Sequence, residues 1–151
     1  MALEVKHFNR IAAPPEKVWE QFADVMGWPS WIPTFRGASW VEGEAWTDGA
    51  RLRMAMGFGP ATLGVDVTIV NVDLPHSIAW TGRRFGVTSI HTWTFTPDRD
   101  GTIMTSEEVF DGPAPQLLGV TGLRPMISRI TESWMDSLQK KVEGTPDTTD
   151  S

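Results

Sequence analysis

The chain has 151 residues and a net charge of −6, and it contains eight Trp, seven Phe, no Tyr and no Cys. This length suits one domain with a real core. The acidic balance disfavours a nucleic-acid surface, which needs clustered Lys and Arg, and the lack of Cys excludes disulfides and thiol catalysis.

The N-terminal part of the chain predicts a strand followed by a helix. Residues 3–11 are strand-like, and Pro14-Pro15-Glu16 then breaks the strand. Proline suits a first helical turn, and an acidic residue there favours the helix dipole. Apolar residues at three- and four-residue spacing predict a buried helix face that ends at Gly27. They are Val18, Trp19, Phe22, Val25 and Met26.

The stretch WPSWIPTF (28–35) combines two prolines with large apolar residues. The prolines argue against a long regular element, and a loop or short turn this apolar must cover something. Trp28 and Trp31 are therefore our candidates for a lid over a cavity.

From residue 39 to residue 110 the chain alternates between strand patterns and turn signals. Asp48-Gly49, Pro75-His76 and the loop 97–101 mark turns. Successive strands on short turns predict an antiparallel sheet. The expected strands are 39–46, 51–58, 64–73, 77–83, 87–96 and 102–110.

The C-terminal part predicts a long helix. An apolar stripe runs from Leu123 to Val142, with Pro125 expected in the first turn and 116–124 as a looser turn or short helix. We expect one domain over 1–143 and a disordered polar tail over 144–151. The N-terminus lacks a signal-peptide pattern and no stretch approaches 18 apolar residues, so we expect a soluble cytoplasmic protein.

The element order predicts an α+β fold in which a curved sheet packs on the long helix. If the sheet wraps the helix incompletely, a cavity remains between them. The chain also resembles a known superfamily in IAAPPEKVWEQFADVMGWPSW (11–31), in VDLPHSIAW (72–80), in the run from His91 through DGTIMTSEEVFDG (100–112) and in the final helix. These stretches resemble START-like, Bet v 1-like (SRPBCC) proteins, in particular the polyketide cyclase/dehydrase-like group. The resemblance implies a helix-grip fold, with a curved antiparallel sheet around a long C-terminal helix and an internal cavity for an apolar small molecule.

The stretch SIHTWTF (89–95) places Ser89, His91, Trp93 and Phe95 on one face of a strand, opposite two threonines. We expect the aromatic face to be concave. The next strand carries Glu108 at the same parity, so the hairpin could bring His91 and Glu108 into one wall. The alternative is that Glu107 is the inward carboxylate.

Two residues are candidates for acid/base chemistry. His91 has a reference pKa near neutrality, and burial would raise the pKa of Glu108. Either could instead be a structural group paired with its neighbours. Asn71 and Ser106 could hydrogen-bond a ligand carbonyl or each other. The full set of predicted ligand-binding residues is Trp28, Trp31, Met54, Met56, Phe58, Asn71, Trp80, Ser89, Trp93, Met104, Ser106, Phe110, Ile127 and Trp134.

We interpret the chain as a binder of a hydrophobic or aromatic small molecule, such as a lipid, polyketide or isoprenoid. The alternative is a polyketide cyclase/dehydratase-type enzyme, and the lack of Tyr weighs against the usual aromatase chemistry. A third class, a partner-binding protein, would need an exposed apolar patch. The three histidines lack metal-ligand spacing and no G-x-G-x-x-G occurs, so we expect no metal and no cofactor. We expect a monomer or homodimer.

Overall fold

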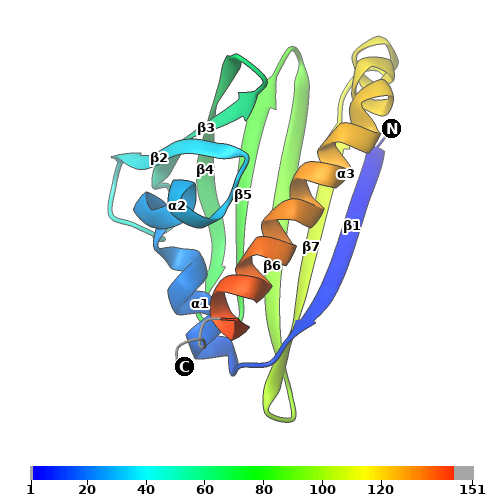
Figure 1. The fold of residues 1–151 in the computed structure, drawn as a ribbon. Helices are drawn as coiled ribbons and strands as arrows, with labels where there is room; N and C mark the ends of the chain where they lie inside the picture. Colours follow the sequence, from blue (N-terminus) through cyan, green and yellow to red (C-terminus); the bar gives the residue numbers. More distant parts are fainter. Residues whose placement is uncertain (1, 145–151) are drawn as a thin grey trace.

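The computed structural model describes residues 2–144 as a curved antiparallel sheet that grips one long helix (Figure 1). The described part leaves out Met1, residues 145–151 and the side chain of Phe58. The predicted disordered tail, 144–151, therefore lies outside it except for Gly144. The elements are β1 (Ala2–Ile11), α1 (Pro15–Ala23), the 3-10 turn η1 (Val25–Gly27), α2 (Trp28–Trp31), β2 (Phe35–Glu42), β3 (Arg51–Phe58), β4 (Ala61–Asp73), β5 (Ser77–Arg84), β6 (Val87–Asp98), β7 (Gly101–Asp111) and α3 (Ala114–Glu143).

The seven strands form one sheet in the order β1-β7-β6-β5-β4-β3-β2. Strands β2 to β7 are a meander, as the turn signals predict, and every pair is antiparallel. The N-terminal strand pairs with the last strand, from Ala2 opposite Asp111 to Ile11 opposite Thr102. The predicted α+β helix-grip architecture is confirmed. No helix within residues 2–144 is long and apolar enough to cross a membrane.

The first strand of the meander ends earlier than predicted. It covers Phe35–Glu42, so the predicted strand 39–46 is wrong at both ends. Trp46 lies in the following loop with a φ of 58°. Its indole N–H donates to the carbonyl of Ala23 at 3.0 Å, and its ring lies 5.0 Å from that of Trp19. Trp46 is therefore buried by contacts with α1, outside any strand.

The long helix begins eleven residues before Pro125, where the sequence suggested a first turn. Pro125 lies inside the helix, and the first turn instead carries Pro115, where a missing N–H costs nothing. The amide of Leu117 donates to Pro113 at 3.0 Å, and the Leu117 side chain is buried. This early anchor lets the helix form despite Gly119 and Gly122.

Aromatic rings fill the space where α1, α2 and α3 meet the concave face of the sheet. Phe22 of α1 lies at the centre, 5.1 Å from Trp93 of β6 and 6.0 Å from Trp134 of α3 between ring centroids. The cluster joins α1, α2, α3 and the concave face of the sheet into one core. Its rings belong to Trp19, Phe22, Trp28, Phe35, Trp46, Trp80, Trp93, Phe95 and Trp134.

Candidate functional site

The hairpin of β6 and β7 places two titratable side chains opposite each other on the concave face. His91 pairs with Glu108 across the strands, so the predicted proximity of these residues is confirmed. Glu108 is the inward carboxylate, with a side chain 17% exposed. Glu107 has the opposite parity and lies 3.8 Å from Lys6 at the outer surface. Strand alternation therefore decides which glutamate enters the core.

A compact polar group surrounds the buried imidazole of His91. Its Nε2 lies 2.7 Å from the Ser106 hydroxyl, and its Nδ1 lies 3.7 Å from Oε1 of Glu108. The ring stacks on Trp93 with a centroid distance of 4.3 Å. We call His91, Ser106 and Glu108 the His91 cluster.

Burial acts on the two titratable members in opposite directions. It lowers the pKa of His91 from 6.5 to about 3, and the nearby His7 lowers it further. Burial raises the pKa of Glu108 from 4.5 to about 7, and no basic side chain of the described residues offsets this shift. Near neutral pH the imidazole is therefore uncharged, while the carboxyl exists in both protonation states.

The His91 cluster can hold a proton in two arrangements. An ionised Glu108 favours a proton on Nδ1 of His91, and the Ser106 hydroxyl then donates to Nε2. A protonated Glu108 favours the other tautomer, in which Nε2–H donates to the Ser106 hydroxyl. A serine hydroxyl serves both arrangements because it donates and accepts. The cluster can consequently give or take a proton, or hydrogen-bond a carbonyl or hydroxyl of a ligand.

A second histidine lies beside the His91 cluster, and sequence reasoning had assigned it no role. His7 of β1 is the cross-strand neighbour of Ser106. Its Nε2 lies 2.9 Å from the Ser128 hydroxyl, and its Nδ1 lies 3.9 Å from Glu132, both on α3. The alternation of Val5, His7 and Asn9 along β1 could have indicated this inward position.

The predicted ligand-binding residues separate into three groups. The buried group is Trp28, Met54, Trp80, Trp93, Met104, Ser106 and Trp134. The half-buried group is Trp31, Met56, Ser89, Phe110 and Ile127, and Asn71 is exposed. Asn71 sits in a bulge of β4 with a φ of 51°, and Ser106 bonds His91 instead of Asn71. The Trp28 indole donates to the Phe22 carbonyl at 2.8 Å, so Trp28 is a core residue and no lid. The prediction for Phe58 lies outside the described side chains.

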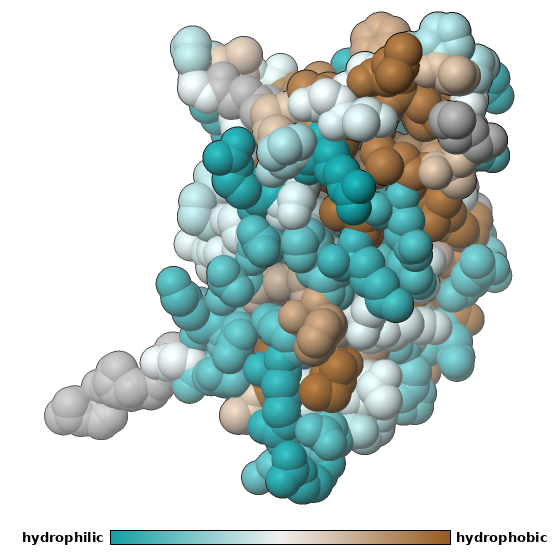
Figure 2. Space-filling view, turned by 90° about the vertical axis from the view of Figure 1, so that its right-hand side faces the viewer, coloured by the Kyte–Doolittle hydropathy of each residue, from teal (hydrophilic) through white to brown (hydrophobic). Residues whose placement is uncertain are grey.

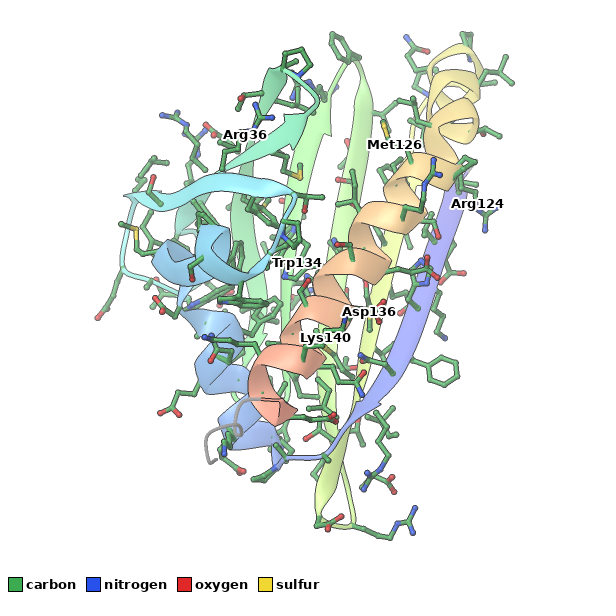
Figure 3. All side chains as sticks on the ribbon, viewed as in Figure 1. Arg36, Arg124, Met126, Trp134, Asp136 and Lys140 are labelled. Atoms are coloured by element: carbon green, nitrogen blue, oxygen red, sulfur yellow. The ribbon has the colours of Figure 1, made fainter. Side chains whose placement is uncertain are left out.

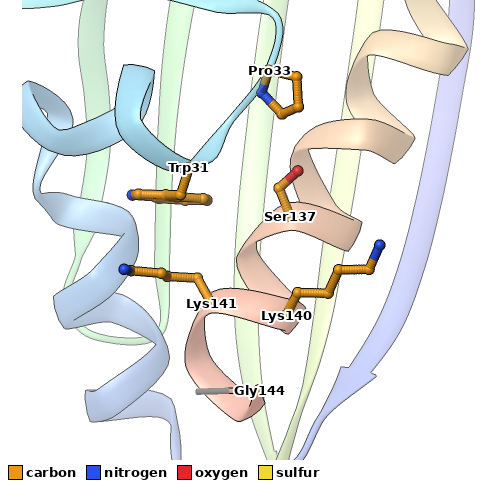
Figure 4. Close-up of a pocket in the computed structure, with 6 residues that line it drawn as sticks. All are labelled: Trp31, Pro33, Ser137, Lys140, Lys141 and Gly144. Carbon is orange, nitrogen blue, oxygen red and sulfur yellow. The ribbon is translucent and has the colours of Figure 1, made fainter. Parts of the chain in front are cut away.

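Two open grooves lie near the C-terminal end of α3. One, of about 430 Å³, is lined by Trp31, Pro33, Ser137, Lys140, Lys141 and Gly144 (Figure 4). The other, of about 530 Å³, is lined by Lys17, Glu20, Gln21, Asp24, Lys141 and Val142. Neither is lined by a residue of the His91 cluster. Among residues 2–144, no group of three or more His, Asp or Glu side chains could hold a metal ion.

The fold defines a class: a seven-stranded antiparallel sheet around a long C-terminal helix is the helix-grip architecture of START-like and Bet v 1-like proteins. A family profile described as polyketide cyclase / dehydrase and lipid transport matches residues 2–143. The chain belongs to this family.

Solved structures with similar folds come from proteins of different kinds. A START superfamily protein from Mycobacterium smegmatis has a TM-score of 0.72 and 14% identity, over 93% of this chain and 97% of that one. Truncated norcoclaurine synthase from Thalictrum flavum has a TM-score of 0.75 and 17% identity, over 95% of each chain. A di-domain ARO/CYC protein of the steffimycin biosynthetic pathway has a TM-score of 0.79 and 13% identity, over 95% of this chain and 51% of that one. No curated protein matches this chain in sequence. At these identities the likeness concerns the fold alone.

Proposed function

We propose that this protein binds a neutral hydrophobic or aromatic small molecule between the upper half of the concave sheet and the N-terminal half of α3. The observation that carries the proposal is the His91 cluster, a buried carboxyl, imidazole and hydroxyl on the concave face, beside the rings of Trp80, Trp93 and Trp134. The family description, polyketide cyclase / dehydrase and lipid transport, supports a ligand of this kind.

The cross-strand row of Gly82, Ser89 and Phe110, which we call the upper row, is more exposed than the rows below it on the concave face. Ser89 pairs with Gly82 on one side and with Phe110 on the other, and all three are half-buried. Trp80 and Trp93, which lie lower on the same face, are buried. Figure 3 shows Trp134 inside the grip and Met126 further up α3, on its side toward the sheet. An apolar ligand placed above Trp134 would complete the burial of this row.

The charge of the His91 cluster favours a neutral ligand. An ionised Glu108 would repel a carboxylate or phosphate, and a buried charge without a partner is costly. A protonated Glu108 or a neutral His91 can donate to a ligand carbonyl or hydroxyl. Polyketide-like or isoprenoid-like molecules with oxygen functions fit these donors better than the ionised end of a fatty acid.

The ligand class can be tested on the purified protein. Native mass spectrometry followed by organic extraction is expected to find a neutral, oxygen-bearing apolar molecule at one copy per chain. If the protein is empty, titration with neutral polyketides, isoprenoids and sterols is expected to change its tryptophan fluorescence. An empty protein that responds to none of them would contradict the proposal.

Filling the upper row should block the ligand. Ser89→Phe places a large ring on the concave face, and we expect ligand affinity to fall by at least about tenfold, equivalent to roughly 1.4 kcal/mol. Thr88→Phe is the matched control, because Thr88 is exposed and has the opposite parity. Fluorescence titration of both variants measures the effect. Equal affinities in the two variants would place the ligand elsewhere.

A second candidate function is acid/base catalysis on a carbonyl ligand. It is favoured by the pKa of Glu108, which burial raises to about 7, since a base with a pKa near the working pH transfers protons best. Glu108 would remove a proton from the carbon next to a carbonyl, and a donor such as Ser106 would stabilise the enolate oxygen. The resulting Glu108 carboxylic acid could then protonate a hydroxyl that leaves as water.

The catalytic candidate predicts a separation of turnover from binding. With a polyketone substrate, Glu108→Gln should lower the rate of cyclisation or dehydration by roughly 10²–10⁴-fold, the usual contribution of a general acid/base. Ligand affinity should stay within about threefold, since Gln keeps the shape of the side chain. Glu107→Gln serves as the control. A Glu108→Gln variant with full turnover would exclude this role.

A further inference from the structure

The turn between β5 and β6 exposes a phenylalanine in a backbone conformation that bulky residues rarely adopt. Phe85 is 83% exposed and has a φ of 53°, and Gly86 follows with a φ of 80°. Arg84 pairs with Val87, so these two residues form the whole turn. Positive φ at both positions is the type I′ geometry, which favours Asn or Gly where Phe85 stands. Strained residues of this kind are often functional.

Two arginines directly precede this exposed phenylalanine in the chain. Arg83 and Arg84 are both exposed, in a chain with a net charge of −6. The guanidinium of Arg84 lies 5.5 Å from the centroid of the Phe85 ring, and it also donates to the Gly64 carbonyl at 2.9 Å. The turn therefore presents an aromatic ring together with positive charge.

The first turns of α3 lie beside the turn and add apolar surface without charge. A methyl group built on Gly86 would lie 3.6 Å from the Gln116 side chain. Residues 112–123 contain no charged residue, and Leu118 and Leu123 are 73% and 50% exposed. Figure 2 shows hydrophobic side chains toward the upper end of the molecule, where Figure 1 places the start of α3. We call residues 83–86 and 114–123 the tip surface.

We propose that the tip surface docks onto an anionic lipid bilayer, with Phe85 at the boundary between headgroups and acyl chains and Arg83 and Arg84 at the lipid phosphates. Aromatic and leucine side chains beside arginines are the combination that binds membrane interfaces. An uncharged helix end can approach the bilayer without desolvating charges.

The position of the tip surface fits exchange of an apolar molecule with the bilayer. It lies at the same end of the grip as the half-buried row of Ser89 and Phe110, so a ligand could pass between bilayer and protein without crossing water. This passage rests on the proposed function, whereas the docking does not depend on any ligand.

Co-sedimentation of the full chain with vesicles tests the docking. We expect binding to phosphatidylcholine vesicles that contain phosphatidylglycerol, weaker binding to pure phosphatidylcholine, and a decrease with added salt. Phe85→Asn should weaken binding by about tenfold or more, from the lost apolar burial. Arg83→Gln and Arg84→Gln should each weaken it by about fivefold.

The Phe85→Asn variant also separates docking from folding. Asn-Gly is the favoured pair for this turn, so the variant should be at least as resistant to urea as the wild type. Phe85→Gly, which the turn also accepts, should behave in the same way. Phe8→Ala is the surface control, because Phe8 is 75% exposed on β1 and should not affect vesicle binding.

The proposal is overturned if the wild type binds neither kind of vesicle, if it binds both equally, or if the Phe85 variants bind as well as the wild type. Failure of the proposed function would look different. If the protein docks on vesicles in a Phe85-dependent way but binds no apolar ligand in solution, the docking proposal stands and the ligand-binding proposal fails.

Discussion

Replacing Phe22 by alanine is expected to lower the free energy of unfolding by about 3–5 kcal/mol. The Phe22 side chain is fully buried. Its ring lies within 5.1 Å of Trp93, 5.7 Å of Trp28 and 6.0 Å of Trp134 between centroids, so it links α1 with the sheet and α3. Rigid indole rings cannot easily collapse into the space left by the truncation. Urea unfolding followed by tryptophan fluorescence measures the loss.

The matched control makes the same truncation on the surface. Phe8→Ala removes a ring that is 75% exposed, and we expect a change within about 0.5 kcal/mol. Similar losses in the two variants would mean that the ring cluster is no special source of stability. A Phe22→Ala loss below about 1 kcal/mol would lead to the same conclusion.

The second large effect concerns the pH dependence of stability. Burial raises the pKa of Glu108 from 4.5 to about 7, so between these values the folded carboxyl holds more protons than the unfolded one. The contribution of Glu108 to the free energy of unfolding is therefore complete below about pH 4.5, and it is lost as the pH rises through 7. At about 1.4 kcal/mol per pKa unit, the loss amounts to about 3 kcal/mol. Glu108→Gln cannot ionise, and it should not show this decline.

His91 acts in the opposite direction. Its pKa is lowered from 6.5 to about 3, so folding becomes more favourable as the pH rises through this range. Between about pH 4.5 and 6.5 the two contributions cancel, and wild-type stability should be flat there before it falls toward pH 8. In Glu108→Gln the stability should keep rising to about pH 6.5 and then level off.

Urea unfolding at three pH values measures this difference. The stability of Glu108→Gln relative to the wild type should increase by about 3 kcal/mol between pH 4.5 and pH 8. Glu107→Gln should follow the wild type, because Glu107 faces outward and its ion pair with Lys6 is exposed. A constant difference at every pH would show that Glu108 titrates in the folded protein as it does in the unfolded chain.

The concave face of the hairpin could be predicted from the sequence because strand alternation is a local property. Once residues 87–96 and 102–110 are strands joined by a short loop, the inward position of His91 also implies that of Trp93. Parity also separates Glu108 from Glu107, and the register of the hairpin showed that Glu108 is the inward one. The helix-grip architecture could be predicted as well, because the order of strands, turns and the final helix allows few alternatives.

Other features required contacts between residues far apart in the chain. Whether Trp28 covers a cavity or fills the core depends on how its ring meets Phe22 and Trp134. The early start of α3 depends on the burial of Leu117, against the weak helix propensity of a segment with two glycines.

The sequence by itself determined which side chains share a face within each strand, and it made the pairing of His91 with Glu108 a hypothesis that the strand register then confirmed. Only the tertiary structure decided what that face meets. It brought β1 beside β7, and so His7 beside Ser106, and it packed rings from α1, α2 and α3 against the concave face. The physical reason is that alternation depends on neighbouring residues, whereas strand order and ring packing depend on contacts between residues about one hundred positions apart.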